Sequence, residues 1–142
     1  MKIPMETFSS YVGETLMYCQ CIEHDIKEIF LSFCKGQEEE FRKRIEEEKW
    51  TLGMTVTALK EIDHQSSKPL FQEVDYSILF SIVRLRNYYA HQVYLTFCYE
   101  DEEDRFEEAY NKAADRLISE RKLLASLYGR VEDVRIFRTR AQ

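Results

Sequence analysis

The sequence predicts an all-α fold, an antiparallel bundle of four helices with room for a short fifth. Hydrophobic residues recur at steps of three and four along four long segments, which is the period of an amphipathic helix. The 142 residues include only 4 Gly and 2 Pro, too few turn formers for a fold of many short strands. Short breaks separate the segments, as is typical of a helical bundle.

The first predicted helix carries an apolar stripe made of Phe8, Val12, Leu16, Cys19, Ile22, Ile26, Ile29 and Phe33. Gly36 follows this stripe, and glycine readily takes the left-handed conformation that closes a helix. The second predicted helix carries a stripe made of Phe41, Ile45, Leu52, Val56 and Leu59. Its opposite face is rich in Glu and Lys, which we interpret as a solvated surface.

A loop over residues 64–69 precedes the third helix, because Pro69 disfavours helical backbone at the residue before it. We predict that the third helix begins near Asp75, a favourable N-cap residue, and continues to about Tyr99. The acidic cluster at residues 100–104 marks the start of the fourth helix, because negative charge is favourable at a helix N-terminus. The stripe of this helix consists of Phe106, Tyr110, Ala113, Leu117, Leu124, Tyr128 and Val131.

We expect residues 1–142 to form a single domain, with a basic, loosely ordered tail at residues 130–142. The sequence has no run of about 18 mostly apolar residues and no visible secretory signal, so we expect no membrane partner. Four cysteines without a CxxC pair favour reduced thiols and a cytoplasmic location.

The net charge of −6 argues against a protein that coats nucleic acid through bulk positive charge. A local basic site is still compatible with this charge, because arginines gather in two places. They are Arg84 and Arg86 in the third helix, and Arg130, Arg135, Arg138 and Arg140 near the C-terminus.

Arg86 interrupts the apolar stripe of the third helix. At 100° per residue, Leu79 and Ala90 lie within about 40° of Arg86, whereas His91 lies about 140° away, at the rim of the stripe. A buried guanidinium needs a partner, so one interpretation is a structural arginine paired with a carboxylate or with helix-end carbonyls. The other interpretation is a functional site.

The segment Arg86-Asn87-Tyr88-Tyr89-Ala90-His91 resembles the Arg-x4–6-His signature of the HEPN superfamily, in its frequent Arg-Asn-x-x-Ala-His form. The resemblance covers this hexapeptide together with the size and the helix count of the chain. HEPN domains are small helical bundles, and many are RNases that act as toxins or as abortive-infection and anti-phage effectors. The resemblance therefore implies a HEPN-like bundle with Arg86, Asn87 and His91 as catalytic residues.

In that family, a homodimer brings two copies of the signature into one cleft. The resemblance also implies metal-independent endoribonuclease activity that leaves 2′,3′-cyclic phosphate ends and needs no cofactor. The residue types suit this chemistry, because histidine exchanges protons near neutral pH and arginine grips phosphate oxygens. An antitoxin or another regulatory protein would be the partner of such a toxin. Further residues that could contact RNA are Tyr88, Tyr89, Tyr94 and Arg84.

One departure from the family concerns the toxins that pair with nucleotidyltransferase antitoxins, which often carry His-x-Tyr. Here the order is His91-Gln92-Val93-Tyr94, so the tyrosine comes one residue later. Membership of that subgroup does not follow from the sequence.

The alternative function is a non-catalytic module: an adaptor, an immunity-type protein or a HEPN relative that binds nucleotides or proteins without cutting. The acidic composition favours this alternative.

The three histidines resemble those of DinB-like helical metalloproteins, but the chain lacks their His-x3-His pair, so we predict no metal site. A cysteine nucleophile is disfavoured because Cys19 falls in a core stripe and Cys21 has no basic neighbour.

Overall fold

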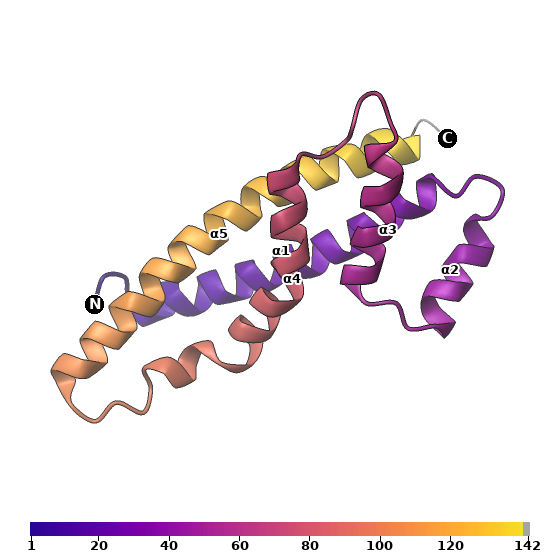
Figure 1. The fold of residues 1–142 in the computed structure, drawn as a ribbon. Helices are drawn as coiled ribbons and strands as arrows, with labels where there is room; N and C mark the ends of the chain where they lie inside the picture. Colours follow the sequence, from indigo (N-terminus) through magenta and orange to yellow (C-terminus); the bar gives the residue numbers. More distant parts are fainter. Residues whose placement is uncertain (141–142) are drawn as a thin grey trace. The chain divides into compact units, whose positions relative to one another are not determined.

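The computed structural model describes residues 1–140, and over this range the chain is helical with no strand (Figure 1). The predicted all-α class is therefore confirmed. The elements in chain order are α1 (Met5–Ser32), α2 (Glu38–Glu47), α3 (Leu52–His64), α4 (Glu73–His91), the short 3-10 helix η1 (Val93–Thr96) and α5 (Glu103–Arg140). None of these helices combines the length and the apolar composition that crossing a membrane requires.

The break after α1 follows the prediction. α1 ends at Ser32, and Gly36 takes a φ of 80°, a conformation that favours glycine. The predicted second helix is instead two helices, α2 and α3. Lys49 has a positive φ of 53°, which ends α2, and the Thr51 hydroxyl accepts the Met54 N–H at 3.2 Å, which caps α3.

α4 begins two residues before Asp75. The Asp75 carboxylate reaches back to accept the Gln72 N–H at 3.1 Å, so Asp75 stabilises the first turn from inside the helix. The helix ends at His91 rather than at Tyr99, and η1 continues the chain. Cys98 is exposed, because residues after His91 no longer follow the helical period used to place it beside the core.

α5 begins within the acidic cluster, as predicted, and runs without a break past Gly129 to Arg140. The segment expected to be a loose tail is therefore helical over residues 130–140, while residues 141 and 142 lie outside the described range. Ion pairs anchor it, because Arg130 binds Asp75 at 2.7 Å and Arg135 binds Asp25 at 2.8 Å. The Arg138 guanidinium donates to Ser32.

The chain divides into two compact units, each built from separate stretches of sequence. Unit 1 consists of Met1–Gln20 and Val83–Ser126, and unit 2 of Cys21–Ile82 and Leu127–Gln142. The single domain expected over residues 1–142 stays a prediction.

Aromatic rings form the centre of unit 1. Phe8 of α1 is fully buried and contacts the rings of Tyr94, Phe97 and Tyr110 at centroid distances of 5.7, 5.3 and 5.2 Å. Large aromatic side chains bury much apolar area, so this cluster fixes η1 and the start of α5 against α1. It is the scaffold on which the candidate site stands.

Unit 2 has its own core, in which Ile26, Ile29, Leu59 and Leu79 are fully buried. Phe30 packs against Trp50, in the connection between α2 and α3, at a centroid distance of 5.7 Å.

α1 and α5 run parallel within each unit, which differs from the simple antiparallel order expected for neighbouring helices. Within each unit, a residue later in α1 contacts a residue later in α5, which is the order expected for parallel helices. These contacts are Phe8–Tyr110 and Glu14–Arg121 in unit 1, and Asp25–Arg135 and Ser32–Arg138 in unit 2.

Candidate functional site

Four of the side chains singled out from the sequence share one face of α4. Arg84, Asn87, Tyr88 and His91 follow the i, i+3, i+4, i+7 spacing, which places them along one stripe of a helix. Tyr88 is half-buried and the other three are exposed. Within residues 1–140, the side chains of Arg84, Asn87 and His91 form no hydrogen bond or ion pair with another residue, so they are available to a ligand.

Arg86 lies elsewhere on the helix. It is half-buried and engaged in an interaction within the chain. By helical geometry its direction differs from that of His91 by about 140°, so one copy does not present the two side chains on one face. Ala90, expected within the apolar stripe beside Arg86, is exposed.

Tyr88 and Tyr89 have different surroundings although they are adjacent. Tyr89 is 2% exposed and its hydroxyl donates to Glu120 of α5 at 2.5 Å. Burial, and then the hydrogen bond to Glu120, raise the pKa of the Tyr89 phenol well above its ordinary value of 10. Tyr89 is therefore a core residue held in its protonated form, and it does not offer its ring to a ligand.

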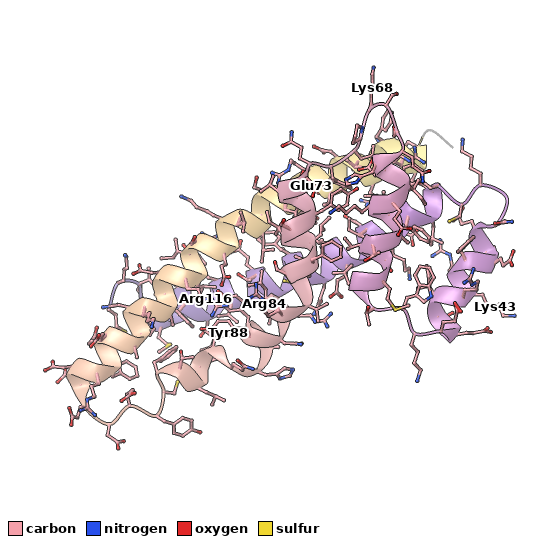
Figure 2. All side chains as sticks on the ribbon, viewed as in Figure 1. Lys43, Lys68, Glu73, Arg84, Tyr88 and Arg116 are labelled. Carbon is pink, nitrogen blue, oxygen red and sulfur yellow. The ribbon has the colours of Figure 1, made fainter. Side chains whose placement is uncertain are left out.

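The Tyr88 ring instead meets a cation. The Arg116 guanidinium of α5 lies 3.7 Å from the ring centroid, and its Nε–H donates to Glu120 at 2.7 Å. Figure 2 shows Tyr88 on α4 and Arg116 on α5 directed toward one another, with Arg84 one turn away on α4. Glu120 thus holds both the Tyr89 hydroxyl and Arg116, and Arg116 in turn orients the Tyr88 ring.

A pocket of about 420 Å³ opens beside this stack. Its lining residues come from α4, η1 and α5, and all belong to unit 1: Tyr88, Thr96, Ala109, Lys112, Ala113 and Arg116. The volume lies in the range of small-ligand sites. Hereafter these six residues are called the Tyr88 pocket.

Tyr94 has a structural role in this arrangement. Its hydroxyl donates to the Ser9 hydroxyl at 2.9 Å and its ring packs at the edge of Phe8. It connects η1 to α1 and is not among the residues that line the pocket.

In the part of the chain that the structure covers, no group of three or more His, Cys, Asp or Glu side chains is arranged to hold a metal ion.

The four cysteines form no disulfide: Cys19 is buried, Cys21 and Cys34 are half-buried and Cys98 is exposed. Burial, and then the charge of Glu38, raise the pKa of the Cys34 thiol, which makes this thiol a weaker nucleophile.

Comparison with known proteins gives no match to a family model, to a characterised protein or to a solved structure.

Sequence reasoning missed the α5 side of the site, because Lys112 and Arg116 lie more than twenty residues after the signature. A signal was nevertheless present. Ala109, Lys112, Ala113 and Arg116 have the i, i+3, i+4, i+7 spacing, so two small residues and two cations share one helical stripe. The two alanines leave space for a pocket, and the two cations line it with positive charge.

Proposed function

We propose that this chain is a metal-independent endoribonuclease of HEPN type, with His91 as the group that transfers protons. The observation that carries the proposal is the exposed face of α4, on which His91 and Asn87 lie beside Arg84 without a hydrogen bond or ion pair to any of residues 1–140. A proton-transfer group must reach the ribose 2′-hydroxyl of its substrate, and an exposed imidazole meets that requirement.

The charge around His91 supports an anionic substrate. Arg84 lies two turns before His91 on the same face, and Lys112 and Arg116 line the Tyr88 pocket next to it. Three cations of unit 1 form a local basic site although the net charge of the chain is −6. RNA cleavage also needs a cation at the scissile phosphate, a role that arginine performs with two parallel hydrogen bonds.

Arg86 takes that role in the proposal, in a homodimer that brings the signatures of two copies together. The separation of Arg86 and His91 around α4 favours a site shared between copies, because each copy directs the two groups to different sides. The product would carry a 2′,3′-cyclic phosphate, and a toxin or defence role would follow from cleavage of cellular RNA.

The test is incubation of the purified protein with labelled single-stranded and structured RNA in EDTA. We expect cleavage by the wild type, with cyclic phosphate ends verified by mass spectrometry, and loss of cleavage in His91→Ala. His24→Ala is the matched control, because His24 is also exposed on a helix and lies in unit 2. RNA that stays intact at every protein concentration would contradict the proposal and favour the non-catalytic interaction module.

A further inference from the structure

We infer that the Tyr88 pocket binds one nucleotide, either free or as part of a single-stranded RNA, with its phosphate at Lys112 and its base against Tyr88 and Arg116. The inference concerns binding alone and does not depend on cleavage. It adds a site on α5 to the residues that the signature identifies.

The phosphate end of the pocket is set by Lys112. This side chain is exposed, and within residues 1–140 it has no acidic partner. Arg116 is partly neutralised through its Nε–H bond to Glu120, but its terminal amino groups make no hydrogen bond within the same range. A lysine ammonium and a guanidinium at i, i+4 can both contact one phosphate, since such side chains are neighbours on a helix.

The base of the nucleotide would bind at the planar groups of the pocket, the Tyr88 ring and the Arg116 guanidinium. The Arg116 guanidinium already lies over the Tyr88 ring at 3.7 Å, so the ring supports the guanidinium from one side before a ligand arrives, and the base would stack on its other side. Aromatic rings and arginine planes both serve as stacking surfaces for unpaired bases, and a rigid surface loses little entropy on binding. Glu120 keeps Arg116 in place.

The floor and the remaining wall suit a small planar group. Ala109 and Ala113 contribute only methyl groups, which is what leaves about 420 Å³ open between α4 and α5. The Thr96 hydroxyl donates to the Val93 carbonyl at 2.6 Å, so its oxygen is left as an acceptor for an amino or hydroxyl group of the ligand. Cationic, stacking and acceptor groups together match a nucleotide better than a purely apolar ligand.

His91 lies one turn after Tyr88 on the same face of α4, with about 5–6 Å between the Cβ atoms. A nucleotide held in the pocket would therefore place its neighbouring phosphodiester near His91. If the proposed cleavage occurs, the Tyr88 pocket would select the nucleotide next to the scissile bond.

The experiment is calorimetric titration of the full chain with AMP, CMP, GMP and UMP, and with a five-nucleotide RNA that carries a non-cleavable 2′-O-methyl backbone. We expect binding that weakens at least about tenfold in Lys112→Ala and in Tyr88→Leu, the effect expected when a charged hydrogen bond or a stacked base is lost. Lys122→Ala is the matched control, because Lys122 is an exposed lysine of α5 outside the pocket, and its affinity should equal that of the wild type.

The mononucleotide and oligonucleotide titrations distinguish a free nucleotide from a nucleotide within an RNA strand. Binding of mononucleotides that depends on Lys112 supports a free nucleotide, and Lys112-dependent binding of the oligonucleotide alone supports an RNA segment. The inference is overturned if neither ligand binds at about 1 mM, or if Lys112→Ala and Lys122→Ala bind equally well. The titration uses ligands that cannot be cleaved, so failure of the proposed cleavage and failure of the pocket are read separately.

Discussion

Arg86 and His91 are five residues apart on α4, and their directions around the helix axis differ by about 140°. Arg86 is half-buried and already interacts within the chain, whereas His91 is exposed. One copy thus presents the two groups to different surroundings. The proposed reaction brings them together only across two copies.

Mixing two inactive variants tests this arrangement. Arg86→Ala and His91→Ala proteins should each fail to cleave RNA, and their mixture should regain activity, because a mixed dimer holds one site with both side chains intact. Random exchange makes half of the dimers mixed with one working site in each, so we expect about one quarter of the wild-type rate.

The measurement is the cleavage rate after subunit exchange, as a function of mixing ratio. Because Arg86 is half-buried, Arg86→Lys provides a second variant that keeps the positive charge, and thermal melts verify that each variant is folded. No regained activity in a mixture shown to exchange subunits would be evidence against a site shared between copies.

Asp63 ties the end of α3 to the start of α4 in unit 2. It is fully buried, and its carboxylate accepts the Leu70 N–H at 2.6 Å, the Phe71 N–H at 3.1 Å and the Tyr76 hydroxyl at 2.5 Å. Asp63→Ala would leave two buried donors and one half-buried donor without an acceptor, so we expect the free energy of unfolding to fall by about 3–5 kcal/mol.

Chemical denaturation measures this loss. Glu61→Ala is the control, since Glu61 is exposed on the same helix, and we expect a change within about 0.5 kcal/mol. Tyr76→Phe removes only one of the three hydrogen bonds and should cost about 1 kcal/mol. A loss in Asp63→Ala no larger than that of Tyr76→Phe would show that the carboxylate does not hold the loop.

Hydrophobic periodicity was enough to predict the helical class and most helix positions, because most stripe residues of α1, α3 and α5 are buried in the cores. The stripe residues of α2, Phe41 and Ile45, are only half-buried. Periodicity failed between α2 and α3, where the stripe continues in phase through Ile45, Leu52 and Val56 although the backbone breaks at Lys49. The decisive interactions there are local: a left-handed residue and a threonine cap. Thr51 followed three residues later by Met54 lacks the Glu or Gln that would have marked a capping box.

The candidate site was predictable only where it lies within one helix. The spacing of Arg84, Asn87, Tyr88 and His91 can be read from the sequence. The pairing of Tyr88 with Arg116 depends on how α4 and α5 pack, and periodicity specifies which face of a helix is buried but not which helix covers it.

Acid should remove the stabilisation that Glu28 provides. Two hydrogen bonds from Arg42 of α2, at 2.9 and 3.1 Å, hold the pKa of the Glu28 carboxyl below its ordinary 4.5. A carboxyl with a lowered folded pKa stabilises the protein above its unfolded pKa, and this contribution disappears as the pH falls through the folded value. Glu28→Gln should therefore lower the free energy of unfolding by about 1 kcal/mol at pH 7 and by much less near pH 3.

Urea denaturation of the wild type and Glu28→Gln at the two pH values provides the comparison. Glu39→Gln is the control, because Glu39 is 91% exposed and its carboxylate lies 4.0 Å from Arg42. We expect it to have little effect at either pH. A Glu28→Gln difference that is the same at both pH values would mean that the ion pair is not its cause.

Base should remove the stabilisation that the Tyr89 phenol provides. Its pKa is raised above 10, first by burial and then by the hydrogen bond to Glu120, so the folded protein keeps the phenol proton longer than the unfolded chain. The stabilisation is complete below pH 10 and is lost as the pH rises above that value. Tyr89→Phe should lower the free energy of unfolding by about 1–2 kcal/mol at pH 7, and this difference should shrink near pH 11.

Tyr99→Phe is the control, because Tyr99 is 79% exposed, and it should leave stability unchanged at both pH values. Tyr76 and Tyr110 also have raised pKa values, but both residues are present in every variant, so their contribution to the pH dependence of stability cancels in the comparison.

Tyr89→Phe should leave nucleotide binding almost unchanged. In this variant the Glu120 carboxylate still accepts the Arg116 Nε–H, so the nucleotide affinity of the Tyr88 pocket should stay within about twofold of the wild type. A variant that kept its stability and lost nucleotide binding would instead place the Tyr89 hydroxyl in the binding site, contrary to its 2% exposure.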